Sequence, residues 1–260
     1  MSLFRRMAQK IRDEEPVALA TVISGGDVGA KMLVSPDAAV LGTLGHERLD
    51  AVVARDAKAE LAAGRSGVRH YGLAGEVARD EVEVFIEAFG PPPQIWLFGA
   101  VDFTAAIGRV AKTLGYRVVV CDARSVFATA QRFPMADEIV VDWPHRLIEE
   151  RGALLGLRDA ICVLTHDAKF DVPAIMAALR TDVGYIGALG SRRTDIDRRE
   201  RLRNAGATEA QLERVQGPIG LDIGAATPEE TGVATMAEII LLRSGRTGRP
   251  LTETEGSVHR

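Results

Sequence analysis

The stretch PPPQIWLFGAVDFTAAIGRVAKTLGYRVVVCD, residues 91–122, decides the fold of the larger part of this chain. Its three opening prolines remove backbone donors and fix φ, so neither a helix nor a central strand can pass through them. An apolar run, a glycine turn, an amphipathic helical pattern and a second apolar run then follow in order. Two apolar strands joined by a helix are typical of a parallel sheet covered on both faces. We therefore place a domain boundary between residues 90 and 91.

The alternation of apolar strands and helical patterns continues towards the C-terminus. Further strand candidates lie at 137–142, 160–166 and 182–190, with helical patterns at 144–155 and 171–180. Two later helices begin with capping boxes, in which Thr208 pairs with Gln211 and Thr227 with Glu230. The α/β class is therefore predicted for residues 91–260, with a Rossmann-like parallel sheet and helices on both of its faces.

The first 90 residues show a different, mixed pattern. Short strand-like runs lie at 16–24, 29–35, 67–75 and 80–90, and one helical pattern lies at 46–64. The residues between the first two runs, Ser24-Gly25-Gly26-Asp27, have the composition of a turn. Residues 1–90 are therefore predicted to form a small α+β domain.

Composition narrows the class of protein. The chain has 260 residues, of which 47% are hydrophobic, and this argues against disorder. A net charge of −4 argues against general nucleic-acid binding. No apolar run approaches the ~18 residues of a membrane helix, and the N-terminus lacks the hydrophobic region of a secretory signal. Because Cys121 and Cys162 lie in apolar runs without metal or redox spacing, we expect buried thiols in a cytoplasmic protein.

The first strand-turn-helix resembles an incomplete dinucleotide-binding loop. Gly99 supplies the tight turn, but Val101 and Thr104 stand where the second and third glycines of the fingerprint belong. Asp122 follows Gly99 by 23 residues, the spacing of an acid that accepts from a ribose hydroxyl, and Arg124 comes next. NAD(P) binding and a Rossmann scaffold with altered ligand chemistry both remain open.

A second glycine turn carries a pair of arginines. Gly187, Gly190 and Ser191 follow an apolar strand, and Arg192 and Arg193 open the next helix. Cations in a first helical turn oppose the helix dipole, whereas exposed amides and glycines there favour an anion. We predict that these five residues bind a phosphate or another oxyanion. The alternative is a solvated helix face, on which later arginines of the same helix pair with neighbouring carboxylates.

Two more turns fall on the same predicted edge of the sheet. His166 and Asp167 follow one strand and are candidates for proton handling or for binding a polar ligand. The alternative is a plain polar turn in which Asp171 caps the next helix. Gly220 and Asp222 lie in a glycine-dense loop, which suggests close approach of the backbone to a ligand or to another chain.

Several segments resemble the xanthine dehydrogenase accessory protein family, XdhC/CoxI. The resemblance rests on YIGALGSRRT from Tyr185, GPIGLDIGAATPEE from Gly217, the THD turn, and the D-A-R-x-x-F-A-T-x-x-R-F-P-x-A-D-E stretch from Asp122. PVALATVIS, GAKMLVSPD and the Gly42–Thr43 turn resemble the N-terminal domain of that family. The paired GALGSRRT and GPIGLDIGA motifs are highly specific.

The resemblance implies a protein that binds molybdenum cofactor and has no turnover of its own. Family members protect the cofactor, promote its sulfuration with a cysteine desulfurase, and pass it to a molybdenum hydroxylase such as xanthine or carbon monoxide dehydrogenase. Molybdopterin carries a phosphate or a nucleotide diphosphate, which suits a glycine turn with paired arginines. The other candidates are an NAD(P)-dependent oxidoreductase and a ligand-free scaffold for a partner enzyme. The appended small domain would also allow a homodimer.

This chain departs from the family pattern where a ligand would be expected. Arg48 stands where relatives commonly carry the cysteine of G-G-G-C-L-E, and Val101 stands at the second glycine of G-A-G-H. The resemblance therefore implies a divergent member with changed ligand chemistry. Acids near His46 are explained by the dipole of the helix that they begin, so no metal site is predicted there.

Overall fold

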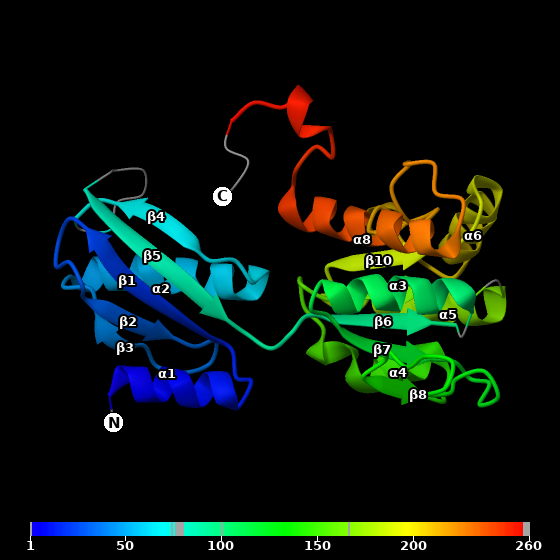
Figure 1. The fold of residues 1–260 in the computed structure, drawn as a ribbon, viewed down its shortest axis with the longest axis horizontal. Coiled ribbons are helices and arrows are strands. Elements are labelled where there is room, and N and C mark those ends of the chain that lie inside the picture. The colour runs from blue at the N-terminus through cyan, green and yellow to red at the C-terminus, as the bar shows by residue number, and fades with distance from the viewer. Residues whose placement is uncertain (1, 74, 76–80, 100, 166, 257–260) are drawn as a thin grey trace. The chain divides into compact units, whose positions relative to one another are not determined.

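The computed structural model describes residues 2–73, 75, 81–99, 101–165 and 167–256 (Figure 1). Contacts divide the chain into two compact units. One runs to Pro91 and also takes in Glu255 and Gly256, and the other spans Pro92–Thr254. The expected boundary at 90/91 lies one residue from this division.

The first unit is a five-stranded antiparallel sheet with the strand order β3-β2-β1-β5-β4. Its elements are α1 (Leu3–Arg12), β1 (Val17–Ser24), β2 (Lys31–Val34), β3 (Leu41–Thr43), α2 (Glu47–Ala63), β4 (Gly67–Tyr71) and β5 (Val82–Phe89). Apolar residues of α2, such as Val53, pack on one face of the sheet, and Met7 of α1 packs on the other. This antiparallel sheet with helices confirms the α+β prediction for the first part of the chain.

Two elements of this unit were not expected. The Gly42–Thr43 turn belongs to strand β3, in which Gly42 pairs with Met32. Gly42 has φ +91°, and a Cβ there would lie 2.3 Å from the carbonyl oxygen of Lys31. Three residues are too few to show a strand period, so only the pairing reveals β3. Helix α1 is equally inconspicuous, because none of its residues is fully buried.

The second unit is a six-stranded parallel sheet with the order β11-β10-β9-β6-β7-β8. Its elements are β6 (Gln94–Phe98), α3 (Asp102–Thr113), β7 (Arg117–Cys121), β8 (Glu138–Val140), α4 (Pro144–Arg151), the 3₁₀ turn η1 (Gly152–Leu154), β9 (Ala160–Val163), α5 (Ala168–Ala178), β10 (Tyr185–Ala188), α6 (Arg192–Asn204), α7 (Glu209–Leu212), β11 (Val215–Gln216), α8 (Pro228–Ser244) and η2 (Leu251–Glu253). The predicted Rossmann-like fold is confirmed, and so are the two capping boxes that begin α7 and α8.

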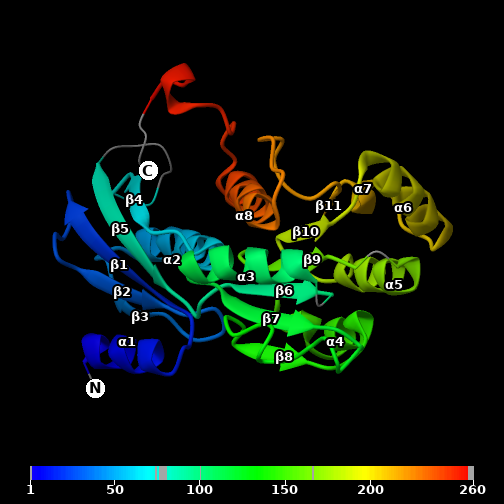
Figure 2. The same cartoon turned by 45° about the vertical axis from the view of Figure 1, so that its right-hand side comes forward.

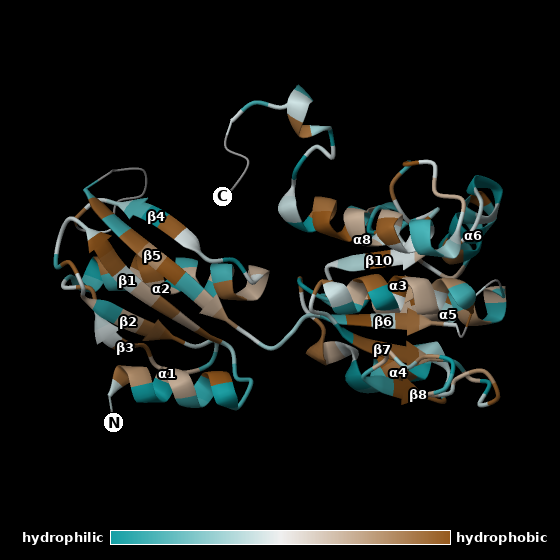
Figure 3. Ribbon diagram, in the orientation of Figure 1, coloured by the Kyte–Doolittle hydropathy of each residue, from teal (hydrophilic) through white to brown (hydrophobic). Residues whose placement is uncertain are grey.

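Helices cover both faces of this sheet, as the continuous apolar strands require. Along β6, Ile95 and Leu97 pack into the cluster that contains α3 and α8. The alternate residues Trp96 and Phe98 pack into the cluster that contains α4 and α5. Figure 3 shows β6 and β7 as largely hydrophobic strands within this layered unit. In α8, Gly232 allows the close packing on α3, since a Cβ there would lie 3.1 Å from the backbone of Ala106.

The strand order reverses next to β6, the first strand of the unit. The chain moves outward through β7 and β8, then returns to β9 on the other side of β6 and continues through β10 to β11 (Figure 2). Open parallel sheets bind ligands beyond the carboxyl ends of their strands at such a reversal. No helix in the described ranges combines the length and the apolar character needed to cross a bilayer.

Candidate functional site

Gly99 lies at the reversal point, directly after β6. Its φ of +106° suits glycine, and a Cβ would lie 2.9 Å from Cγ2 and 3.1 Å from the backbone nitrogen of Thr165. Thr165 follows β9, so this glycine lets the ends of two neighbouring strands approach each other. The glycine is therefore explained by packing within the protein, and a cofactor-binding role for Gly99 stays a prediction.

The turn after Gly99 is closed by a threonine hydroxyl. Thr104 is fully buried, and its hydroxyl donates to the carbonyl oxygen of Gly99. The backbone nitrogen of Val101 in turn lies 3.4 Å from Oγ1 of Thr104. Val101 packs against the cluster beneath α3. Side chains of the protein thus occupy the two positions where a dinucleotide loop carries its second and third glycines.

Asp122 lies after β7, where the spacing predicts a ribose contact. Its buried carboxylate accepts from the backbone nitrogen, Nε and Nη2 of Arg124, at 2.9, 2.9 and 2.8 Å. The hydrogen bonds that Arg124 donates to the Asp122 carboxylate raise the pKa of Arg124 above its ordinary value. Both carboxylate oxygens therefore hold the arginine in place, and a ribose hydroxyl would have to compete with that arginine.

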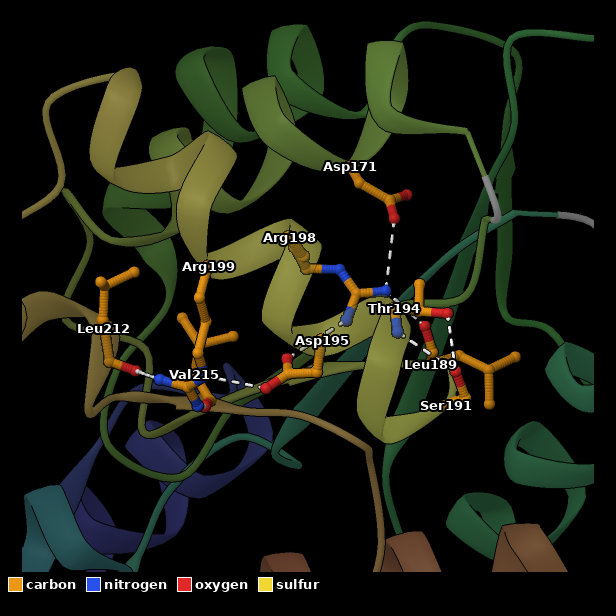
Figure 4. A network of polar contacts seen from close by, with 9 residues as sticks. All are labelled: Asp171, Leu189, Ser191, Thr194, Asp195, Arg198, Arg199, Leu212 and Val215. Carbon is orange, nitrogen blue, oxygen red and sulfur yellow. Dashed lines mark hydrogen bonds and ion pairs between the residues drawn. The ribbon is translucent and has the colours of Figure 1, made fainter.

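The turn after β10 contains the predicted anion site. Gly187 is part of β10, where a Cβ would collide with the ring of Tyr185, so this glycine serves packing. Gly190 has φ +150°, and Ser191 caps α6 by accepting from the backbone nitrogen of Thr194 at 3.1 Å (Figure 4). The serine oxygen already fills one role in the helix cap.

Arg192 and Arg193 follow this turn and lie at the surface. The Arg192 side chain is 87% exposed, and its Nη2 lies 4.0 Å from Oδ2 of the equally exposed Asp222. Arg193 is exposed and makes no ion pair with any described residue. The predicted pair is therefore accessible to a ligand but not enclosed, and anion binding there stays a prediction.

Arg198 and Arg199 of α6 pair with Asp195, as the alternative interpretation of this helix expects, but the network that they form is largely buried. Arg198 is only 2% exposed. Its Nη2 donates to the carbonyl oxygen of Leu189 and lies 3.5 Å from Oδ2 of Asp171, and its Nη1 lies 3.4 Å from Oδ1 of Asp195 (Figure 4). The solvated-face interpretation is wrong for Arg198, because this side of α6 packs inward against α5 and the β10–α6 turn.

Arg199 extends the network to the edge of the sheet. Its Nε lies 2.8 Å from Oδ2 of Asp195, and its Nη1 and Nη2 donate to the carbonyl oxygens of Leu212 and Val215 at 3.1 and 2.9 Å. A carboxylate at i with arginines at i+3 and i+4 is the only sequence signal of this arrangement. Arg199, which shares the buried carboxylate of Asp195 with Arg198, thus holds α6, α7 and β11 together.

The turn after β9 joins the same network. Thr165 donates its hydroxyl to Oδ1 of Asp171, the carboxylate that also faces Arg198. The interpretation of Asp171 as the cap of α5 is wrong. The cap is Asp167, which accepts from the backbone nitrogen of Lys169 at 3.0 Å, and this hydrogen bond lowers the pKa of Asp167. The other candidate in this turn, His166, lies outside the described residues.

The first part of the glycine-dense loop after β11, residues 217–220, packs against the protein itself, whereas residues 222–227 are exposed. A Cβ on Gly217 would lie 2.0 Å from Oδ1 of Asp195. Gly220 has φ +96°, and its nitrogen donates to Oε2 of Glu238 at 2.9 Å, an oxygen that also accepts from the Tyr185 hydroxyl. These contacts explain both glycines without a ligand. Binding roles for Gly220 and for the exposed Asp222 therefore stay predictions.

A pocket of about 390 Å³ lies at the amino ends of the parallel strands, between the C-terminal ends of α4 and α5. Ile148 and Ala177 line it together with Arg180, whose Nη2 lies 3.2 Å from Oε1 of Glu149. The guanidinium group of Arg180 is already paired with Glu149. The pocket also lies away from the carboxyl ends of the strands, where ligands of this fold bind.

Both cysteines are buried, as expected. Burial raises the pKa of the Cys121 thiol to about 12, and it raises the pKa of Cys162 as well. Neither sulfur is accessible as a thiolate, so neither thiol suits a metal ligand or a sulfur carrier. The exposed charged groups at the carboxyl ends of the strands include Arg192 and Arg193 as well as the carboxylates of Asp167 and Asp222.

Comparison with known proteins supports the family suggested by the motifs. The XdhC Rossmann domain matches residues 95–239, more than half of the chain, and the XdhC and CoxI family matches residues 11–72. A solved structure described as a xanthine dehydrogenase from Bacillus halodurans aligns with a TM-score of 0.54 at 21% identity, covering 95% of this chain and 97% of that one. That likeness shows the fold alone.

Three curated relatives are similar over parts of their length. The uncharacterized protein YqeB of Escherichia coli K12 is 28% identical over 95% of this chain and 47% of its own length. A probable xanthine dehydrogenase subunit of Bacillus subtilis 168 is 32% identical over 62% of this chain and 46% of its own. The molybdenum cofactor insertion chaperone PaoD of Escherichia coli K12 is 29% identical over 35% and 29%. The chain thus spans less than half the length of these relatives, and on the two domain matches it belongs to the XdhC and CoxI family.

Proposed function

We propose that this protein binds molybdenum cofactor as cargo and assists its maturation and insertion into a molybdenum hydroxylase. Family membership and similarity to a molybdenum cofactor insertion chaperone support the proposal. A relative described as a probable xanthine dehydrogenase subunit supports the class of client enzyme. A cysteine desulfurase as sulfur donor and a homodimer as the working assembly are further parts of this proposal.

The observation that carries the proposal is the set of accessible arginines beyond the carboxyl ends of the parallel strands. Arg124 and Arg132 lie in the loop after β7, and Arg192 and Arg193 lie after β10. All four are exposed although the chain is acidic overall. Guanidinium groups bind phosphate through paired hydrogen bonds, and the cofactor carries a phosphate or diphosphate.

The residues fit the organic part of the cofactor better than its metal. No thiol in the described part of the chain is accessible, and the position where relatives commonly carry a cysteine is the exposed Arg48. Within the same ranges, no group of three or more His, Cys, Asp and Glu side chains is arranged to hold a metal ion. The protein would therefore bind the phosphate and the ring atoms of the cofactor, and the metal would be coordinated by ligands that do not come from this protein.

The test is retention of molybdopterin, extracted from a molybdoenzyme, by the purified full chain during gel filtration. Oxidation of the eluted fraction to a fluorescent pterin measures the amount bound. The double variant Arg192→Ala/Arg193→Ala should weaken binding by about tenfold or more, because a hydrogen bond to a charged group contributes ~1.5–3 kcal/mol. Arg201→Ala is the matched control, since Arg201 is an exposed arginine on the same helix. Absence of any retention by the wild-type chain would refute the proposal.

The competing proposal is an NAD(P)-dependent oxidoreductase. It rests on the strand order and on Gly99, Asp122 and Arg124, but the carboxylate of Asp122 is already engaged by the arginine. Titration with NADH and NADPH distinguishes the two. Trp143, partly exposed at the start of α4, is the better fluorescent reporter, because Trp96 is buried in the core. Sub-millimolar binding of either nucleotide without binding of molybdopterin would favour the oxidoreductase.

A further inference from the structure

The loop between β7 and β8 brings two guanidinium groups close to two phenylalanine rings, and these four side chains are called the stack below. The guanidinium carbon of Arg124 lies 4.5 Å from the ring centre of Phe127, and that of Arg132 lies 5.5 Å from the same ring. Arg132 also lies 5.7 Å from the ring centre of Phe133. Of these four residues, only Arg124 is a candidate from the sequence, as a contact for a nucleotide.

Buried groups fix both ends of this stack. At one end, the buried Asp122 holds Nε and Nη2 of Arg124, so the plane of that guanidinium is set. At the other end, Phe133 is buried in the cluster beneath α3. Between these anchors, Phe127 is 39% exposed. The loop thus has an aromatic and cationic surface that is accessible to solvent and is held in place by buried groups at both ends.

The charges of the stack are not balanced within the described residues. Asp122 compensates Arg124, but Arg132 forms no ion pair with any residue that the structure describes. Two guanidinium groups near one small ring repel each other, and an anion or a carbonyl-rich ring would relieve that repulsion.

We propose that Arg124, Phe127 and Arg132 form a stacking platform for the fused nitrogen heterocycle of the bound cargo. Flat rings stack on aromatic side chains and on guanidinium planes, and guanidinium N–H groups donate to ring carbonyl and nitrogen acceptors. The inference rests on the proposed function, in which the ring is a pterin. A purine base has the same chemistry and is the other source that the experiment has to distinguish.

The position of the platform suits a ligand that also reaches the predicted phosphate site. In the strand order β10-β9-β6-β7, three strand spacings separate the end of β7 from the end of β10. At 4.7–4.9 Å per spacing, this corresponds to roughly 14 Å along the sheet edge. A ring on the platform and a phosphate after β10 would thus belong to one extended ligand that crosses the reversal point at Gly99.

The experiment compares dissociation constants of the full chain for molybdopterin and, separately, for guanosine monophosphate by equilibrium dialysis. Phe127→Ala should weaken binding of the ring-bearing ligand by about tenfold, the size of a base-stacking contribution. Phe127→Tyr should bind within about twofold of wild type, and Arg132→Lys should bind more weakly although it keeps the charge. Val126→Ala is the matched control, since Val126 is 79% exposed in the same loop and takes no part in the stack.

The outcomes separate the platform from the proposed function. If Phe127→Ala and Arg132→Lys bind molybdopterin like wild type while Arg192→Ala/Arg193→Ala does not, the platform is refuted and the cargo proposal stands. If the wild-type chain binds only guanosine monophosphate, and Phe127→Ala abolishes that binding, the platform stands with a nucleobase as its ligand and the cargo proposal fails. If neither ligand binds, both are refuted.

Discussion

The two halves of helix α6 carry the same residue type and use it in opposite ways. Arg192 and Arg193, in the first turn, are exposed, and the nearest carboxylate to Arg192 is 4.0 Å away. Arg198 and Arg199, two turns later, are held by Asp195 and by backbone carbonyl groups. An arginine-rich helix therefore combines an accessible half with a structural half.

The difference teaches that neighbouring elements, and not residue type, decide what an arginine does. Arg198 faces Asp171 of α5 and the carbonyl oxygen of Leu189, so its charge is enclosed and compensated. The first-turn arginines face solvent, where the helix dipole opposes them and an anion would stabilise them. Variants that remove one or the other half should separate loss of stability from loss of binding.

The largest effect is expected for Arg198→Ala. Removing this guanidinium takes away the cation that faces the buried Asp171 and one of the two cations that face Asp195, which should lower the free energy of unfolding by ~3–5 kcal/mol. Urea denaturation followed by circular dichroism measures the change. Arg192→Ala should stay within ~0.5 kcal/mol of wild type, as is usual for surface substitutions. Equal losses of unfolding free energy in the two variants would contradict the division of α6 into an accessible half and a structural half.

A smaller loss is expected for Gly217→Ala. The new Cβ would lie 2.0 Å from Oδ1 of Asp195, so the loop or the carboxylate has to move. Overpacking of this kind costs about 1–3 kcal/mol of unfolding free energy. Gly156→Ala is the control, because its Cβ would find its nearest atom at 4.0 Å. If both variants unfold at the wild-type urea concentration, Asp195 is not held as described.

Arg199→Ala should cost less than Arg198→Ala, because the Arg199 side chain is partly exposed and water can replace some of its hydrogen bonds. We expect a loss of about 1–2 kcal/mol, from hydrogen bonds to Asp195, Leu212 and Val215. Hydrogen exchange measured by mass spectrometry should accelerate in residues 209–216. Unchanged exchange there would show that Arg199 does not connect α6 to β11.

The smallest effect is expected for a surface ion pair, that of Lys112 with Asp137 at 2.8 Å. Partial burial acts to raise the pKa of Asp137, but hydrogen bonds from Lys112 and from the backbone of Val118 outweigh it and lower that pKa. Because the pKa of Asp137 is lower in the folded state, its carboxylate stabilises the fold at pH values above the ordinary pKa of 3.8. This stabilisation is lost as the pH falls through the pKa of the folded state. After allowance for solvent screening, Asp137→Asn should cost about 0.5–1 kcal/mol at pH 7.

Urea denaturation of wild type and Asp137→Asn at several pH values measures this contribution. The difference between the two proteins should be constant from pH 7 down to about pH 5 and shrink below about pH 4. A difference that grows as the pH falls would mean that the pKa of Asp137 is raised in the folded state.

The fold could be predicted from the sequence because its signals are local. Continuous apolar runs such as RVVVCD, the glycine at the end of β6 and the capping box of Thr227 with Glu230 each determine nearby backbone. Strand β3 escaped prediction because three residues carry no period, and it exists only through its pairing with β2.

The site could be predicted only in part because its contacts are distant in sequence. The spacing of the residues predicts that Asp122 and Gly99 lie at strand ends. It does not predict that Arg124 binds the carboxylate oxygens of Asp122, or that Thr165 lies close to Gly99. Likewise, no local pattern distinguishes Arg198 from the exposed Arg201 on the same helix. The two arginines differ because only Arg198 packs against α5. The contact between α5 and α6 depends on the strand order, which no local sequence pattern specifies.

The central claim is that accessible arginines beyond the carboxyl ends of the parallel strands hold the cargo. A crystal structure of the full chain soaked with extracted molybdopterin tests it most directly. We predict the phosphate within about 3 Å of the amides or guanidinium groups after β10, and the pterin ring against Phe127. A phosphate bound instead in the pocket between α4 and α5, or on residues 2–91, with Arg192 and Arg193 still facing solvent, would contradict the claim.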